Sequence, residues 1–142
     1  MFKNIFKKNN NKNNNKNILI IALLIHAAKI DENYTENEKK IIKKAIMELD
    51  GVSEKDSEDL LKHAEKKEKE SNQIVEFTRE IKKYSLDYRL KIIEIIWKII
   101  YSDGISDNYE SNLTRRICGL LYLSDKDNGI IKTKVKNSLN KT

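Results

Sequence analysis

The chain has 142 residues, no proline, four glycines and a net charge of +6, which favours a single helical domain and argues against a sheet protein. Residues 1–17 carry +5 and residues 126–142 carry +4, which leaves −3 on residues 18–125. An acidic body argues against nucleic-acid binding. The single cysteine, Cys118, excludes an internal disulfide, and its apolar neighbours predict a buried thiol, so we expect a reducing, cytoplasmic location.

Residues 1–17 are rich in asparagine and lysine and poor in apolar side chains, which predicts a disordered basic tail. The initial MFKNIF and the lysines after it offer a peripheral contact with a membrane surface. The apolar run over residues 18–30 is too short to span a bilayer, so it is predicted as a core helix and not as an export signal. The folded domain is therefore expected over residues 18–140.

An internal repeat at an offset of 72 residues aligns the stretch from Ile20 with the stretch from Ile92. Each copy contains an apolar helix (18–30 and 85–101), an acidic turn, and a helix with one apolar face. A helix that is apolar nearly all round is buried, so the two apolar helices are expected at the centre. The repeat predicts an all-α fold, a compact domain of about seven helices in two pseudo-symmetric halves.

Helix boundaries are marked by capping residues along the chain. Asp50-Gly51 is predicted to end the second helix, and a very polar helix with a solvated face follows. A short helix is then striped by Ile74, Phe77 and Ile81. The predicted cap residues are Thr35, Ser53, Ser85, Asp107 and Ser124.

Two glutamates in the acidic turns are explained by local structure alone. Thr35-x-x-Glu38 and Asp107-x-x-Glu110 both have the spacing of a capping box, in which the first side chain accepts from the amide three residues on and the glutamate accepts from the cap amide. Such a cap contributes about 1 kcal/mol. These glutamates therefore have a structural role with or without a ligand.

Asp31 and Asp103 are not explained in this way. Each follows the carboxyl end of an apolar helix, where the helix dipole disfavours a negative charge, and each precedes a glutamate by seven positions. Carboxylates with turn carbonyls are the ligands of hard cations, so the turns predict a divalent-cation site for calcium, magnesium or manganese in preference to zinc. The candidate metal ligands are Asp31, Glu38, Asp103 and Glu110. His26 and His63 are interpreted as a core and a surface histidine, not as ligands.

The second acidic turn and the helix after it resemble the TerB-like (tellurite resistance protein B) family. The matching residues are Asp103, Gly104, Tyr109, Glu110, Leu113, Arg115, Arg116, Ile117, Gly119, Leu120, Leu121, Ser124 and Asp125. The first turn is similar to the family's first signature through Leu23, Leu24, His26, Ala27, Ala28, Asp31 and Glu38, and departs from it at Glu32, where the family has glycine. The resemblance covers roughly residues 18–128. It implies an all-helical domain of two related halves, acidic turns that bind a divalent metal, and a role in the response to tellurite or other chemical stress, often in membrane-associated assemblies.

No catalytic triad, CxxC, phosphate loop or dinucleotide motif occurs, so the sequence predicts a protein that is not an enzyme. The leading hypothesis is a metal-binding stress-response module. The alternative is a metal-free module whose acidic turns are helix caps and whose basic tails contact an unknown protein partner or a membrane surface.

Overall fold

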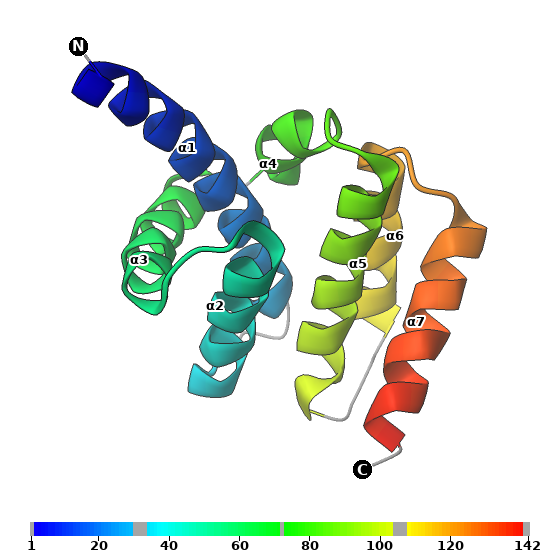
Figure 1. Cartoon of the computed structure of the whole chain (residues 1–142). Helices are drawn as coiled ribbons and strands as arrows, with labels where there is room; N and C mark the ends of the chain where they lie inside the picture. Colours follow the sequence, from blue (N-terminus) through cyan, green and yellow to red (C-terminus); the bar gives the residue numbers. More distant parts are fainter. Residues whose placement is uncertain (1, 30–33, 72, 104–107, 141–142) are drawn as a thin grey trace.

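A computed structural model describes residues 2–29, 34–71, 73–103 and 108–140, with side chains over 15–29, 34–71, 73–102 and 112–139. Throughout these residues the regular structure is helical, without a strand, which confirms the all-α class (Figure 1). The elements are α1 (Phe2–Ala28), α2 (Glu36–Asp50), α3 (Glu54–Glu70), α4 (Ile74–Ile81), α5 (Leu86–Ile100), the 3-10 helix η2 (Tyr101–Asp103), α6 (Asn108–Leu120) and α7 (Asp125–Asn140). None of the helices within these ranges is both long and apolar enough to cross a membrane.

Helix α1 lies at the centre and contacts α2, α3, α4 and α5. Its residues Ile20–Ile25 are buried on every side, as the continuous apolar pattern predicts. Helix α5 is the second central helix, with Trp97 and Ile96 fully buried and contacts to α2, α6 and α7. The two apolar runs of the repeat therefore form the middle of the core.

The two halves of the repeat have the same local architecture. In each half the central helix turns back into the helix that follows it, as α1 does into α2 and α5 into α6, and the members of each pair are in contact. Helices α1 and α5 also contact one another, and both run downward in Figure 1. The repeat therefore brings its two apolar helices into contact.

The predicted caps stand where the sequence places them within the described ranges. Ser53, Ser85 and Ser124 each accept a hydrogen bond from the amide three residues on, at 3.2, 3.2 and 3.0 Å. Gly51 ends α2 with φ of 66°, the left-handed conformation that glycine adopts without strain. The predicted cap Asp107 lies outside the described residues.

The amino-terminal segment has a helical backbone, and the disordered tail over residues 1–17 stays a prediction. The backbone of residues 2–17 continues α1 as helix, because each added residue gains one backbone hydrogen bond once the apolar part of the helix has formed. Lys16 reaches Asp50 of α2 at 3.3 Å, and Asn17 is buried. The last turn of this segment therefore belongs to the packed molecule, while a domain boundary near residue 18 stays a prediction.

Candidate metal site

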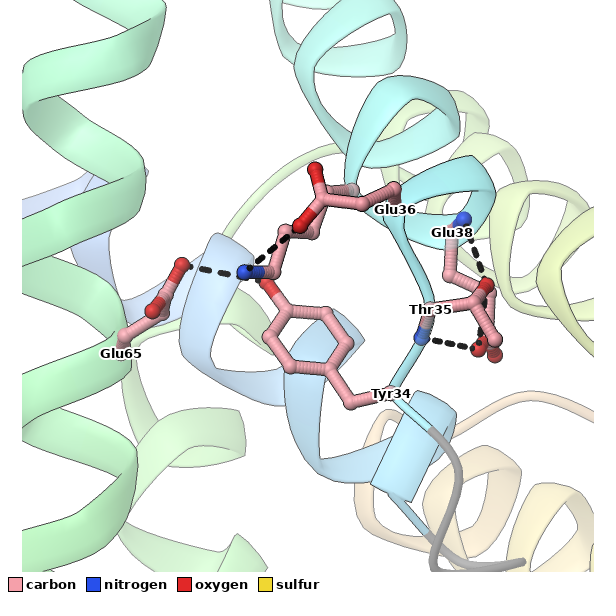
Figure 2. Close-up of polar contacts among 6 residues, drawn as sticks. Tyr34, Thr35, Glu36, Glu38 and Glu65 are labelled. Atoms are coloured by element: carbon pink, nitrogen blue, oxygen red, sulfur yellow. Dashed lines mark hydrogen bonds and ion pairs between the residues drawn. The ribbon is translucent and has the colours of Figure 1, made fainter.

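The first acidic turn leads into a complete capping box at the start of α2. Oε1 of Glu38 accepts hydrogen bonds from the backbone amide of Thr35 at 2.9 Å and from its hydroxyl at 3.0 Å, and Oγ1 of Thr35 accepts from the amide of Glu38 at 3.1 Å. Figure 2 shows the Glu38 side chain turned back toward Thr35. Glu38 as a whole residue is 6% exposed. The structural role predicted for Glu38 is confirmed.

Tyr34 directly precedes the capping box and contacts a carboxylate of α3. Its hydroxyl donates to Oε1 of Glu65 at 3.4 Å (Figure 2). Burial and then the charge of Glu65 raise the pKa of the Tyr34 hydroxyl well above its usual range, and the charges of Glu36 and Glu38 act in the same direction. Two lysines already lie beside these carboxylates: Lys39 pairs with Glu36 at 3.4 Å, and the ammonium groups of Lys39 and Lys29 lie 5.0 and 5.8 Å from the ring centroid of Tyr34.

The structure places the four candidate ligands to different extents. Glu38 is the one whose side chain is described, whereas Asp31 and the side chains of Asp103 and Glu110 lie outside the described residues. By its backbone, Asp103 ends η2 directly after α5, and Glu110 is in the first turn of α6. Within the described side chains, no three histidine, cysteine or acidic residues are grouped so as to hold a metal ion.

The helices that flank the acidic turns are in contact within each half and through the two central helices. Helix α1 contacts α2 and α5, and α5 contacts α6, whereas α2 begins at the left of the molecule and α6 at the right in Figure 1. Glu38 and Glu110 are each the third residue of their helix, in the first turn of α2 and of α6. The chemistry of this donor set, carboxylates beside turn carbonyls, suits a hard divalent cation.

Glu68 is a charged site that sequence reasoning missed. It is 8% exposed within the helix predicted to be a solvated face. Lys29 at the end of α1 contacts its Oε2 at 2.7 Å, and Nδ1 of His26 lies 3.5 Å from its Oε1. The signal was present in the spacing, because Glu68 continues the buried stripe of Leu61 and Ala64 at helical intervals. The glutamate ties α3 to the central helix, and His26 lies beside it.

A second polar cluster joins α2, α5 and the start of the buried part of α1. Asp50 accepts a hydrogen bond from the hydroxyl of Tyr88 at 2.9 Å and pairs with Lys16, whose ammonium lies 4.9 and 4.8 Å from the ring centroids of Tyr84 and Tyr88. Burial and then the hydrogen bond to Asp50 raise the pKa of Tyr88. This cluster uses its charges internally and so serves the fold.

The surroundings of Cys118 do not favour a nucleophilic role for its thiol. The thiol is buried in the core as predicted, and burial followed by the charges of Asp125 and Asp127 raises its pKa to about 12. A protonated, enclosed thiol is a poor nucleophile. His63, by contrast, is exposed on α3, as the sequence predicts.

Comparison with known proteins identifies the family. No curated protein and no solved structure matches the chain. The family model described as "Tellurite resistance protein TerB" matches residues 17–133, which include both halves of the repeat and both acidic turns. Since the match spans most of the chain and the fold is all-α, the chain belongs to the TerB tellurite resistance protein family.

Proposed function

We propose that this chain is a non-enzymatic module that binds a divalent cation through Asp31, Glu38, Asp103 and Glu110. The observation that carries the proposal is the contact between α1 and α5, the two central helices that precede the two acidic turns in the sequence. The chemistry of the four residues supports it, because neighbouring carboxylates repel one another unless a cation, a lysine or a proton is present, and carboxylate oxygens are ligands that hard divalent cations prefer.

The proposal is tested by thermal and denaturant unfolding in Ca²⁺, Mg²⁺, Mn²⁺ and Zn²⁺. A cation at 100 times its dissociation constant raises the free energy of unfolding by about 2.7 kcal/mol. Asp103→Asn removes one ligand charge and reduces this gain. Asp59→Asn is the matched control, because Asp59 is an exposed carboxylate on α3 away from the turns, and it keeps the gain. If none of the four metals changes the free energy of unfolding of the unmutated protein, the proposal is contradicted.

We further propose that the module works in the cytoplasm in the response to tellurite or other chemical stress. The family description, which names tellurite resistance, supports this role. Expression in a tellurite-sensitive bacterium is expected to raise the tellurite concentration that stops growth, and Asp103→Asn is expected to lose that effect while Asp59→Asn keeps it. Equal growth in tellurite with and without the unmutated protein would contradict a role in tellurite resistance.

A membrane-surface adaptor is the second candidate function. Lys3, Lys7, Lys8 and Lys12 lie on the amino-terminal part of α1, which extends past the other helices in Figure 1. A basic helix end is attracted to anionic lipid at roughly 1 kcal/mol per lysine near the surface. Co-sedimentation with phosphatidylserine vesicles is expected to weaken with salt and to vanish on deletion of residues 2–14. Binding that survives the deletion would contradict this role.

A further inference from the structure

A groove of about 650 Å³ lies between α2 and α5, with Leu139 of α7 at one edge. Its residues on α2 run from Asn37 to Leu49, which is about 18 Å of helix at 1.5 Å per residue. The groove is therefore about as long as three turns of a further helix. It is separate from the charged clusters around Glu68 and Asp50.

The bottom of the groove is apolar. Ile41, Ala45 and Leu49 follow one another at four-residue intervals on α2, so they form one stripe along its length. Ile95 and Tyr101 face the same groove from α5 and η2. All but Ile95 remain partly exposed although they pack against the core. We refer to these five residues as the apolar floor.

The edges of the groove are positively charged. Lys44, Lys91 and Lys98 line it and are exposed, and none of the three forms an ion pair with a described side chain. Glu94 is neutralised by Lys134 at 3.2 Å, which leaves Glu48 as the one acidic group lining the groove outside an ion pair with a described side chain. We refer to the three lysines as the cationic rim. The groove therefore combines an apolar floor with a net positive border.

We infer that this groove binds an acidic amphipathic helix of a partner protein. An apolar face presented at i, i+3 or i+4 and i+7 fits a floor of this length, and Asp or Glu beside that face meets the cationic rim. The chain's own ends are poor occupants, because residues 1–17 carry +5 and are repelled by the same lysines, and α7 already forms one edge of the groove. The inference is independent of metal binding.

The test measures fluorescence anisotropy of three labelled, helix-stabilised peptides of about 12 residues, the length of about three turns. All share one apolar stripe, and the remaining positions are acidic, neutral or basic. The full chain is expected to bind the acidic peptide best, with an affinity that falls as salt rises. The double substitution Lys91→Glu with Lys98→Glu is expected to weaken binding about tenfold or more and to reverse the preference toward the basic peptide.

Two further variants separate the groove from general charge. Lys62→Glu with Lys69→Glu makes the same charge change at exposed positions on α3 and keeps the affinity. Ala45→Gln fills the floor without changing charge, and it weakens binding of all three peptides. Circular dichroism checks that each variant is folded.

Several results would overturn the inference. These are equal binding of the three peptides, no binding of any of them, or the same loss in the α3 control as in the rim variant. A self-associated chain in sedimentation equilibrium whose association is lost in Ala45→Gln would assign the groove to a second copy instead. Displacement of a fluorescent fatty acid, with no peptide binding, would assign it to a lipid.

Discussion

Asp50 stands at the end of α2, where a negative charge opposes the helix dipole, and two partners stabilise it there. Tyr88→Phe removes the hydroxyl group and leaves the Asp50 carboxylate with Lys16 as its one remaining partner of the two. Because a hydrogen bond to a charged group contributes about 1.5–3 kcal/mol, we expect a loss near 1.5 kcal/mol in the free energy of unfolding at pH 7. Guanidinium denaturation measures it, and an unchanged midpoint would show that the contact contributes nothing.

The raised pKa of Tyr88 also predicts how the free energy of unfolding falls at alkaline pH. The pKa of Tyr88 is raised in the folded chain, so above about pH 10 the unfolded chain releases this proton while the folded chain keeps it. The stabilising contribution is complete below pH 10 and is lost as pH rises from there toward the folded pKa. Unfolding at pH 8, 10 and 11 should show a steeper loss for the unmutated protein than for Tyr88→Phe. Tyr122→Phe, at an exposed ring, is the control and should keep the steep loss.

The ion pair of Glu68 with Lys29 provides a third test of a single residue. Glu68→Gln leaves the Lys29 ammonium without its carboxylate at the junction of α1 and α3, and we expect a loss of about 1–3 kcal/mol. Glu58→Gln, at an exposed surface pair with Lys43, should change stability by less than about 1 kcal/mol. Equal effects in thermal unfolding would place Glu68 among ordinary surface charges.

At the residue scale, sequence and structure agree where the chemistry is local. The pairing of Thr35 with Glu38 needs three residues and no tertiary contact, so the spacing predicted it. Glu68 was missed because a glutamate in a run of charges is usually solvated, and the lysine that neutralises it comes from a helix distant in the sequence. The other three candidate ligands, Asp31, Asp103 and Glu110, stay predictions.

At the scale of the elements, the caps set the helix boundaries. Gly51 has φ of 66° with no atom near enough to obstruct a Cβ, so Gly51→Ala tests backbone strain alone and should cost about 1 kcal/mol. Gly129 lies inside α7 with equally open surroundings, and Gly129→Ala should raise stability by about 0.5–1 kcal/mol. Opposite signs in thermal unfolding would confirm the prediction, and losses in both variants would contradict it.

The end of α6 shows the limit of reading elements from sequence. The amide of Leu123 donates to the carbonyl of Cys118 and that of Tyr122 to Gly119, a Schellman motif in which Tyr122 takes the left-handed position at φ of 58°. Glycine is the residue expected there, and Gly119 lies three positions too early. The turn is fixed by burial of Leu121 and Leu123, a tertiary cause that a local pattern does not contain.

For the whole molecule, the repeat was the informative signal, since two apolar runs at a fixed offset predicted two central helices in contact. The start of the domain depends on tertiary contacts, because Lys16 contacts Asp50 of α2 and the ring of Tyr88 of α5, and Asn17 is buried. Deletion of residues 2–14 should keep the melting temperature within a few degrees. Deletion of residues 2–17 should lower it further, because it also removes the Lys16 contact with Asp50. Equal melting temperatures for the two deletions would contradict the structural role of Lys16.

The central place of α1 has a consequence for how the chain is made. The ribosome releases α1 first, yet the helix that covers its remaining apolar side, α5, ends only at Ile100. At about 5–20 residues per second, the apolar run of α1 waits on the order of ten seconds for that partner. During synthesis the apolar run of α1 is thus the apolar segment that stays exposed for the longest time. The yield of folded protein should therefore depend more on the supply of chaperones than on the stability of the folded state.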